Sequence, residues 1–106
     1  MDNRTPAYHI TNAAQADIEQ LYLNGAAQFG QFQADKYAAG LVAAFDRIAR
    51  YPRLTRLRDE IDPPIRALPY GSHIILYDVD SEDQVTVVRV RHGREDWIVE
   101  SHDPDV

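Results

Sequence analysis

Cysteine is absent from the chain of 106 residues, and lysine, methionine and tryptophan each occur once. The missing thiols exclude a disulfide framework, a thiolate nucleophile and a zinc–thiolate site. Long apolar runs are missing too: runs such as Ile74 to Tyr77 are far too short to span a bilayer, and the N-terminal residues carry no apolar signal segment. These absences predict a cytoplasmic protein that does not contact a membrane.

The chain is short and acidic, and its positive charge is nearly all arginine. We expect one domain over residues 1–106, with its core at about 7–98 and an acidic tail at about 99–106. The net charge of −6 opposes binding to phosphates, so no direct, sequence-specific nucleic-acid binding is expected. Arginines gather in residues 47–66 and 89–94. Each group forms either an ion-paired surface or a cationic face for an acidic partner, and the sequence leaves both open.

A first helix is predicted over about residues 13–29, because apolar residues recur there at spacings of three, four and seven. Its apolar face consists of Ala14, Ile18, Leu21, Tyr22 and Phe29. Asn12 followed by Gln15 fits a capping box, with Thr11 as the alternative cap. Gly30 is expected to end the helix, because glycine accepts the left-handed backbone past a helix end.

A second helix is predicted from Ala34 to Tyr51, where Pro52 ends the helical period. The connection between the helices is very short, which predicts an antiparallel helical hairpin. Gly40 lies inside this helix, where glycine costs about 1 kcal/mol relative to alanine. It either permits a close approach of the two helices or is neutral.

Short β-branched and aromatic stretches predict four strands. They lie at residues 8–10, 65–68, 72–79 and 84–91. The polar turn at 80–83 makes the last two an antiparallel hairpin, residues 52–64 are expected to be irregular, and residues 95–100 are compatible with a short helix. The order β-α-α-β-β-β predicts an α+β fold, in which the helical hairpin packs on one face of a small, mainly antiparallel twisted sheet.

Period-two alternation divides the last strand into two faces. One carries Val85, Val87, Arg89 and Arg91, and the other carries Thr86, Val88, Val90 and His92. The second set is less charged, so we expect it to lie under the helices. Arg89 and Arg91 would then lie on the open, concave face, where a partner can reach them.

Familiar catalytic motifs, such as Gly-x-Ser-x-Gly, a Gly-rich phosphate loop or His-Glu-x-x-His, are missing from the sequence. The histidines at positions 9, 73, 92 and 102 have no partners at metal-ligand spacing, so no metal site and no cofactor are expected. A triad of Ser72, His92 and Asp96 can be written, but its spacing does not favour it.

An RNA-cleaving centre is the alternative for the arginine-rich strand end. The residues that could supply its acid, base and cations are His92, Arg89 and Arg66, with Tyr70 or Tyr77. No base is paired with a specific acid, however, and the acidic residues after the strand would repel RNA.

Packing is the competing interpretation of most of these residues. His73 and Tyr77 share a strand face, where such residues more often pack than react. Gly71 is explained as a turn glycine ahead of the strand. Arg66 is expected to pair with an acidic neighbour. The candidates are Asp59, Glu60 and Asp62.

The order of segments over about residues 7–98 resembles that of a known family. An early strand precedes the helix that starts Ala13-Ala-Gln-Ala-Asp17-Ile18, and the second helix ends in Phe45-Asp-Arg-Ile-Ala-Arg-Tyr51-Pro52. Arg66 then precedes Gly71-Ser-His73 and Ile-Leu-Tyr77, and the last strand ends in Arg89-Val-Arg-His92-Gly93-Arg94-Glu-Asp96. In this order and spacing the chain resembles the ParE toxins of the RelE/ParE superfamily, the toxin halves of bacterial type II toxin–antitoxin modules.

The resemblance implies a toxin held inactive in a hetero-oligomer with a ParD-like antitoxin, whose disordered C-terminal segment folds over the helical hairpin and the sheet groove. It implies DNA gyrase as the target, without catalytic activity. The alternative is ribosome-dependent mRNA cleavage by the RelE-like branch, whose members are strongly basic, unlike this chain. The residues expected to bind the antitoxin are Ile18, Leu21, Tyr22, Phe29, Arg66, Tyr77 and Arg89. The residues expected to contact the target are Arg89, Arg91, Arg94 and Trp97.

Overall fold

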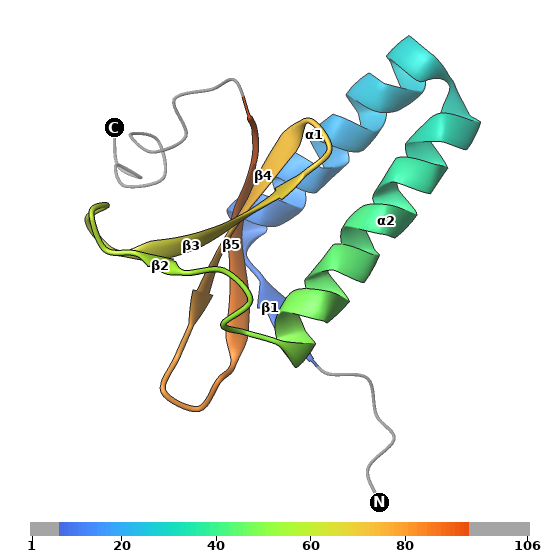
Figure 1. Cartoon of the computed structure of the whole chain (residues 1–106). Helices are drawn as coiled ribbons and strands as arrows, with labels where there is room; N and C mark the ends of the chain where they lie inside the picture. Colours follow the sequence, from blue (N-terminus) through green and yellow to red (C-terminus); the bar gives the residue numbers. More distant parts are fainter. Residues whose placement is uncertain (1–6, 94–106) are drawn as a thin grey trace, which may run out of the picture.

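Two helices lie on a five-stranded sheet in the computed structural model of the chain, which describes residues 7–93 (Figure 1). The elements are β1 (Tyr8–Ile10), α1 (Asn12–Phe29), α2 (Gln31–Arg50), β2 (Leu57–Arg58), β3 (Ile65–Tyr70), β4 (His73–Val79) and β5 (Val85–His92). The strand order is β1-β5-β4-β3-β2; β1 runs parallel to β5 and the other neighbours are antiparallel.

The predicted α+β fold is therefore confirmed, with one correction. The segment 52–64 is not wholly irregular, because it contributes the two-residue edge strand β2. The predicted helix at 95–100 and the acidic tail lie outside the described residues.

Thr11, rather than Asn12, caps the first helix. The Thr11 hydroxyl accepts a hydrogen bond from the Ala14 N–H at 3.0 Å and donates one to the Val88 carbonyl at 2.7 Å. The Thr11 N–H also bonds the Val87 carbonyl at 3.0 Å. The alternative cap is thus confirmed and the Asn12 capping box is wrong. Thr11 follows β1 directly, and its bonds to β5 fix the point at which the chain turns from strand to helix.

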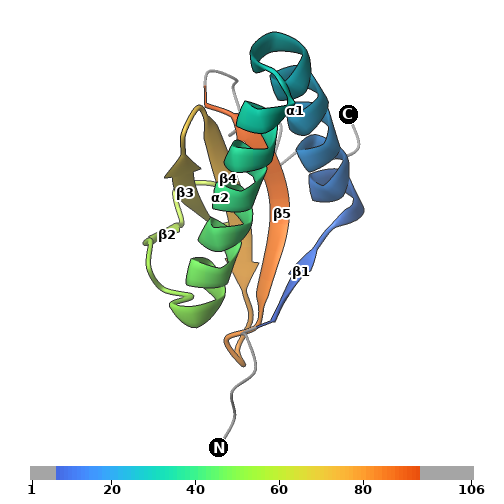
Figure 2. The same ribbon diagram turned by 90° about the vertical axis from the view of Figure 1, so that its right-hand side faces the viewer.

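A single residue, Gly30, ends α1 and precedes α2. Its φ of 91° is a conformation that favours glycine, as predicted. The two helices form the expected hairpin over one face of the sheet, and the Gly30 end of the hairpin projects past the sheet (Figures 1 and 2). Phe29 lies at that end and is 66% exposed, so this member of the predicted apolar face is not buried against the sheet.

The main core lies between the hairpin and the sheet. Its largest fully buried side chains are Leu41, Phe45 and Ile48 of α2, Ile75 and Tyr77 of β4, and Val85 and Val87 of β5. A smaller cluster covers the opposite face of the sheet and consists of Ile61, Ile65, Ala67 and Leu76, with Ile74 and Val88 packed against it. The sheet therefore buries apolar side chains on both faces.

A β-bulge at Val88 changes the predicted faces of β5. Leu76 of β4 pairs with Arg89 while the next residue, Tyr77, pairs with Val87, so Val88 is left without a partner in the ladder. One inserted residue exchanges the faces that follow it. Val87 thus packs under the helices and Val88 packs on the opposite face, which is the reverse of the period-two expectation. Val90, beyond the bulge, lies in the main core as expected.

Candidate functional site

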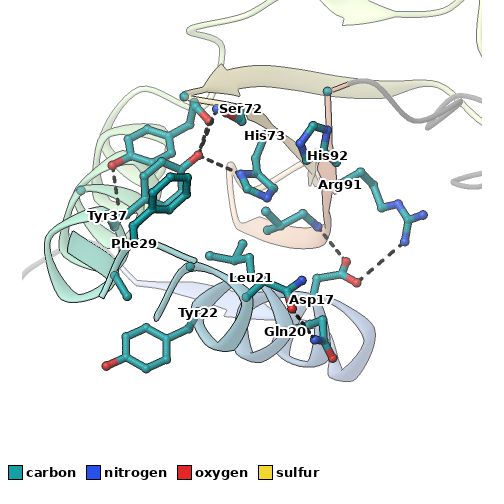
Figure 3. A pocket seen from close by; sticks show the side chains of 18 of the residues that line it. Asp17, Gln20, Leu21, Tyr22, Phe29, Tyr37, Ser72, His73, Arg91 and His92 are labelled. Atoms are coloured by element: carbon teal, nitrogen blue, oxygen red, sulfur yellow. Dashed lines mark hydrogen bonds and ion pairs between the residues drawn. The ribbon is translucent and has the colours of Figure 1, made fainter. Parts of the chain in front are cut away.

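An open groove of about 1580 Å³ lies between the helical hairpin and one end of the sheet (Figure 3). Its walls come from the second half of α1, the first half of α2, the β3–β4 turn and the end of β5. Four of the residues expected to bind a partner line it, namely Leu21, Tyr22, Phe29 and Arg91, and so does His92 of the ribonuclease alternative. The groove therefore joins part of the predicted helical surface to Arg91 and His92 at the end of β5.

Two tyrosines hold the floor of this groove together. The Tyr37 hydroxyl of α2 donates to the Tyr70 carbonyl at 3.1 Å, and the Tyr70 hydroxyl donates to the Tyr37 carbonyl at 3.1 Å. Their ring centroids lie 4.9 Å apart. We call this reciprocal pair the tyrosine clasp. It ties the middle of α2 to the end of β3.

Two glycines make room for the clasp. A Cβ atom at Gly40 would lie 2.0 Å from the Tyr70 hydroxyl oxygen, and one at Gly71 would lie 2.5 Å from the Tyr37 hydroxyl oxygen. Gly71 is also the predicted turn glycine, with φ of 55°. The sequence analysis offered two explanations for Gly40, a close approach of the two helices or no structural role, and both are wrong. Gly40 admits a side chain from the sheet.

The Tyr37 hydroxyl also organises the start of β4. It accepts the Ser72 N–H at 3.1 Å and lies 2.8 Å from Nδ1 of His73. A phenol has one proton and two lone pairs. With its proton given to Tyr70, all these groups are satisfied if His73 Nδ1 carries a hydrogen and donates it. Burial raises the pKa of Tyr37, so the phenol keeps its proton at neutral pH.

His73 and His92 are brought together by strand pairing. They are direct partners in the β4–β5 ladder, and their ring centroids lie 5.3 Å apart. They are 19 residues apart in the sequence, so spacing alone did not show the pair. His73 packs against Tyr37 as well, with ring centroids 5.6 Å apart, which agrees with the packing interpretation.

Arg89 is joined to α1 by a carboxylate that the sequence analysis missed. Nε and Nη2 of Arg89 donate to the two oxygens of Asp17 at 2.7 and 2.9 Å, and the Val90 N–H donates to Asp17 Oδ2 at 3.0 Å. Nη1 of Arg91 lies 3.9 Å from Asp17 Oδ1. The Arg89 side chain is 26% exposed and that of Asp17 is 14% exposed. Arg89 is therefore not an open cationic group as predicted, but half of a bidentate ion pair that anchors α1 to β5.

Tyr77 and Arg66 face inward from the sheet. Tyr77 has no exposed surface, and its hydroxyl lies 2.9 Å from that of Thr55. The Arg66 guanidinium donates to the Thr55 carbonyl, not to the acidic neighbours expected from the sequence. Neither residue lines the groove. Tyr77 is thus corrected from a partner-binding residue to a core residue, because a side chain without exposed surface cannot touch a partner.

The alternative catalytic set is not assembled. Arg66 pairs across the strands with Tyr77, which faces the helices, whereas Arg89 pairs with Leu76, which faces the opposite side. Direct cross-strand partners lie on the same face of a sheet. Arg66 and Arg89 therefore leave the sheet on opposite faces, while His92 lies at the groove.

The end of the hairpin forms an uncharged surface. Residues 20–34 contain no charged side chain. Leu23, Phe29 and Phe32 are 61%, 66% and 78% exposed there. We call residues 20–34 the hairpin tip. The helical periodicity, which selects buried positions, gave no signal for Leu23 or Phe32.

The other predicted residues of α1 are partly covered. Ile18 and Leu21 pack against the main core. The Tyr22 hydroxyl donates to Asp35 Oδ1 at 2.5 Å, and this hydrogen bond raises the pKa of Tyr22. Arg94 and Trp97, predicted to contact a target, lie outside the described residues, as does Asp96.

No helix within residues 7–93 is long and apolar enough to cross a membrane. The histidine and acidic side chains of the same residues form no group of three or more that could hold a metal ion.

The comparisons with known proteins agree with one another. Residues 8–97 match the family model described as the ParE toxin of the type II toxin–antitoxin system parDE. Toxin ParE1 of Mycobacterium tuberculosis (strain H37Rv) is 42% identical over 89 residues, which cover 84% of this chain and 91% of the relative. Toxin ParE1 of Caulobacter vibrioides is 28% identical over 85 residues, or 80% and 86% of the two chains. A solved chain of the chromosomal ParDE TA system from P. aeruginosa shares the fold, with a TM-score of 0.69 at 17% identity, over 83% of this chain and 96% of that one.

Proposed function

The chain belongs to the ParE toxin family of type II toxin–antitoxin systems, and on this basis we propose that a ParD-like antitoxin neutralises it and that it inhibits DNA gyrase without catalysis of its own. A solved neighbour of the same fold comes from a ParDE system, which supports an antitoxin partner. The target is inferred from the family alone.

The hairpin tip is the observation that carries the antitoxin part of the proposal. Three large apolar side chains are more than 60% exposed in a stretch without charge, although 26% of the whole chain is charged. Exposed apolar patches of this kind mark protein interaction sites. The groove continues from the tip to β5, so an antitoxin segment that covers Phe29 can extend along it.

Replacing Phe29 with alanine is expected to weaken antitoxin binding about thirtyfold or more, since truncating an aromatic anchor at an interface costs about 2 kcal/mol or more. Stability should change little, because Phe29 is 66% exposed. Titration calorimetry with the product of the neighbouring antitoxin gene measures the affinity. Val42→Ala is the control: Val42 is 49% exposed on α2 but outside the groove, and its affinity should stay within about twofold. Equal losses of antitoxin affinity in both variants would show that the hairpin tip is not part of the interface.

The absence of an assembled catalytic set supports a binding role for the toxin. Arg66 and Arg89, two of the three residues of the ribonuclease alternative, leave the sheet on opposite faces, and each is engaged: Arg66 by the Thr55 carbonyl and Arg89 by Asp17. Catalysis requires its groups to converge on one reacting atom.

Purified toxin is expected to inhibit supercoiling by gyrase and to trap cleaved DNA, and premixing with the antitoxin should restore supercoiling. Agarose gels of relaxed plasmid with gyrase and ATP measure this. A parallel in vitro translation reaction tests the alternative. Undiminished supercoiling at large molar excess of toxin rejects the gyrase proposal, and messenger RNA cut at the ribosomal A site would favour the ribonuclease.

A further inference from the structure

Positive charge gathers at the end of α2 and in the residues that follow it. Residues 47–58 contain five arginines and no acidic residue, in a chain that carries 17 acidic residues and a net charge of −6. We call residues 47–58 the arginine segment. It begins in the last turn of α2, passes through a turn in which the Leu54 N–H donates to the Tyr51 carbonyl at 2.9 Å, and ends in the edge strand β2. It is a local positive surface on an acidic protein.

The two arginines of α2 in this segment are exposed and carry no ion pair. Within residues 7–93, the guanidinium groups of Arg47 and Arg50 form neither a salt bridge nor a hydrogen bond. Arg53 and Arg56 form ion pairs in which every side chain is more than half exposed, and such pairs contribute little. The helix dipole favours positive charge in the last turn of a helix, but it does not account for the arginines beyond that turn.

Large apolar side chains are exposed among these arginines. Tyr51, Leu54 and Leu57 are 62%, 45% and 42% exposed. Tyrosine and arginine are enriched at protein–protein interfaces, where lysine is depleted. Surfaces that bind DNA are instead dominated by contacts to phosphate, which the negative net charge of this chain opposes. The mixture of arginine and exposed apolar side chains therefore fits an acidic protein surface better than it fits DNA.

The arginine segment lies at the far end of α2 from the hairpin tip (Figures 1 and 2). The helix has 20 residues, so its two ends are about 30 Å apart. None of the residues of the segment lines the groove. The tip is uncharged, whereas this end is positive. The molecule thus has two separate surfaces with the features of an interface, and they suit partners of different chemistry.

We propose that the arginine segment is the surface through which the toxin contacts its target, and that its counterpart is an acidic protein surface of gyrase with an apolar contact for Tyr51. The proposal rests on the proposed function, because gyrase is the target there. Arg47 and Arg50 supply charges that do not have to leave an existing ion pair. Arg89, which the sequence suggested as a target contact, is held by Asp17 instead.

Arg47→Gln/Arg50→Gln tests this surface. The toxin concentration that halves supercoiling by gyrase should rise about tenfold or more, since charge pairs across an interface contribute to affinity. The affinity for antitoxin, measured by calorimetry, should stay within about twofold. A folded variant that inhibits like the native toxin, or that loses antitoxin affinity to the same extent, overturns the proposal and leaves the proposed function standing. Failure of the native toxin to inhibit gyrase overturns both.

Two control variants separate local charge from net charge. Arg47→Lys/Arg50→Lys keeps the positive charge and should inhibit gyrase within about threefold of the native toxin. Glu19→Gln changes the net charge by one unit at an exposed position of α1 outside the groove, and it should leave inhibition unchanged.

A gel-shift measurement separates a protein contact from a DNA contact. Native toxin without gyrase should not retard linear DNA at the concentrations that inhibit supercoiling. If it does, and Arg47→Gln/Arg50→Gln does not, the arginines contact DNA and the acidic protein surface is wrong.

Discussion

Replacing Gly40 with alanine is expected to lower the free energy of unfolding by about 2 kcal/mol, although alanine is the better helix former. The new Cβ would lie 2.0 Å from the hydroxyl oxygen of Tyr70 and 3.0 Å from its ring carbon Cζ, so the tyrosine has to move. Overpacking typically costs about 1–3 kcal/mol and a lost hydrogen bond about 1 kcal/mol, against about 1 kcal/mol gained in helix propensity. The tyrosine clasp opens, and the groove floor opens with it.

Gly25→Ala is the matched control for this substitution. Gly25 lies in α1, and a Cβ there would meet the Ala34 Cβ at 3.8 Å, an ordinary contact. We therefore expect this variant to be unchanged or stabilised by up to about 1 kcal/mol. Urea denaturation followed by circular dichroism measures both variants.

A double-mutant cycle assigns the loss to the clasp. Tyr70→Phe removes the oxygen that the new Cβ would strike, so Gly40→Ala should cost about 1 kcal/mol less in that background than in the native chain. Purely additive losses, or a Gly40→Ala variant as stable as Gly25→Ala, would show that the close approach at Gly40 is not a constraint on the fold.

The local patterns of the sequence predicted the elements, because each depends on neighbours within a few residues. Helical spacing placed α1 and α2, Gly30 separated them, and the polar turn at 80–83 joined β4 to β5. The bulge at Val88 was not predicted. The apolar–polar alternation does break at Val87 and Val88, but two adjacent valines also suit a regular strand that is buried on both faces, so only the pairing with β4 reveals the inserted residue.

The contacts of the candidate site were harder to predict, because they join residues far apart in the chain. Tyr37 and Tyr70 are 33 residues apart, and Asp17 and Arg89 are 72 residues apart. The sequence marked Arg89 as a charged residue on a strand, which was correct. It did not mark Asp17, one acid among 17 acidic residues, as its partner. An arginine identified from sequence as a binding residue thus proved to be a link between two elements.

This link bears on how the toxin would meet an antitoxin. Hydrogen bonds join the helical hairpin to the sheet on either side of the hairpin tip, through the tyrosine clasp on α2 and through Asp17 on α1. The clasp joins neutral groups and is fixed by two glycines. Asp17, in contrast, is an acceptor whose place at Arg89 another carboxylate can take, and whose place at the Val90 N–H a backbone carbonyl can take. We therefore expect antitoxin binding to alter the α1 contact and to leave the α2 contact intact.

Tyr77→Ala is expected to destabilise the protein by about 3–5 kcal/mol, the range for deleting a buried aromatic side chain. Tyr77 is fully buried among residues of the main core, including Phe45, Ile75 and Val87. Such a loss is a large part of the roughly 5–15 kcal/mol that stabilises a small domain. The variant should unfold at much lower urea concentration, and its antitoxin affinity should fall only as far as its folded fraction does.

Tyr77→Phe and Tyr51→Ala are the controls that give this result its meaning. Tyr77→Phe keeps the ring and loses the hydroxyl contacts with Thr55, 2.9 Å away, and with the Pro52 carbonyl, 3.4 Å away, so it should cost about 1 kcal/mol. Tyr51→Ala removes a tyrosine side chain that is 62% exposed and should change stability by less than about 1 kcal/mol. If Tyr77 were instead a binding residue, as the sequence suggested, Tyr77→Ala would keep its stability and lose antitoxin affinity. That outcome would require Tyr77 to leave the core, where it has no exposed surface, before it could touch a partner.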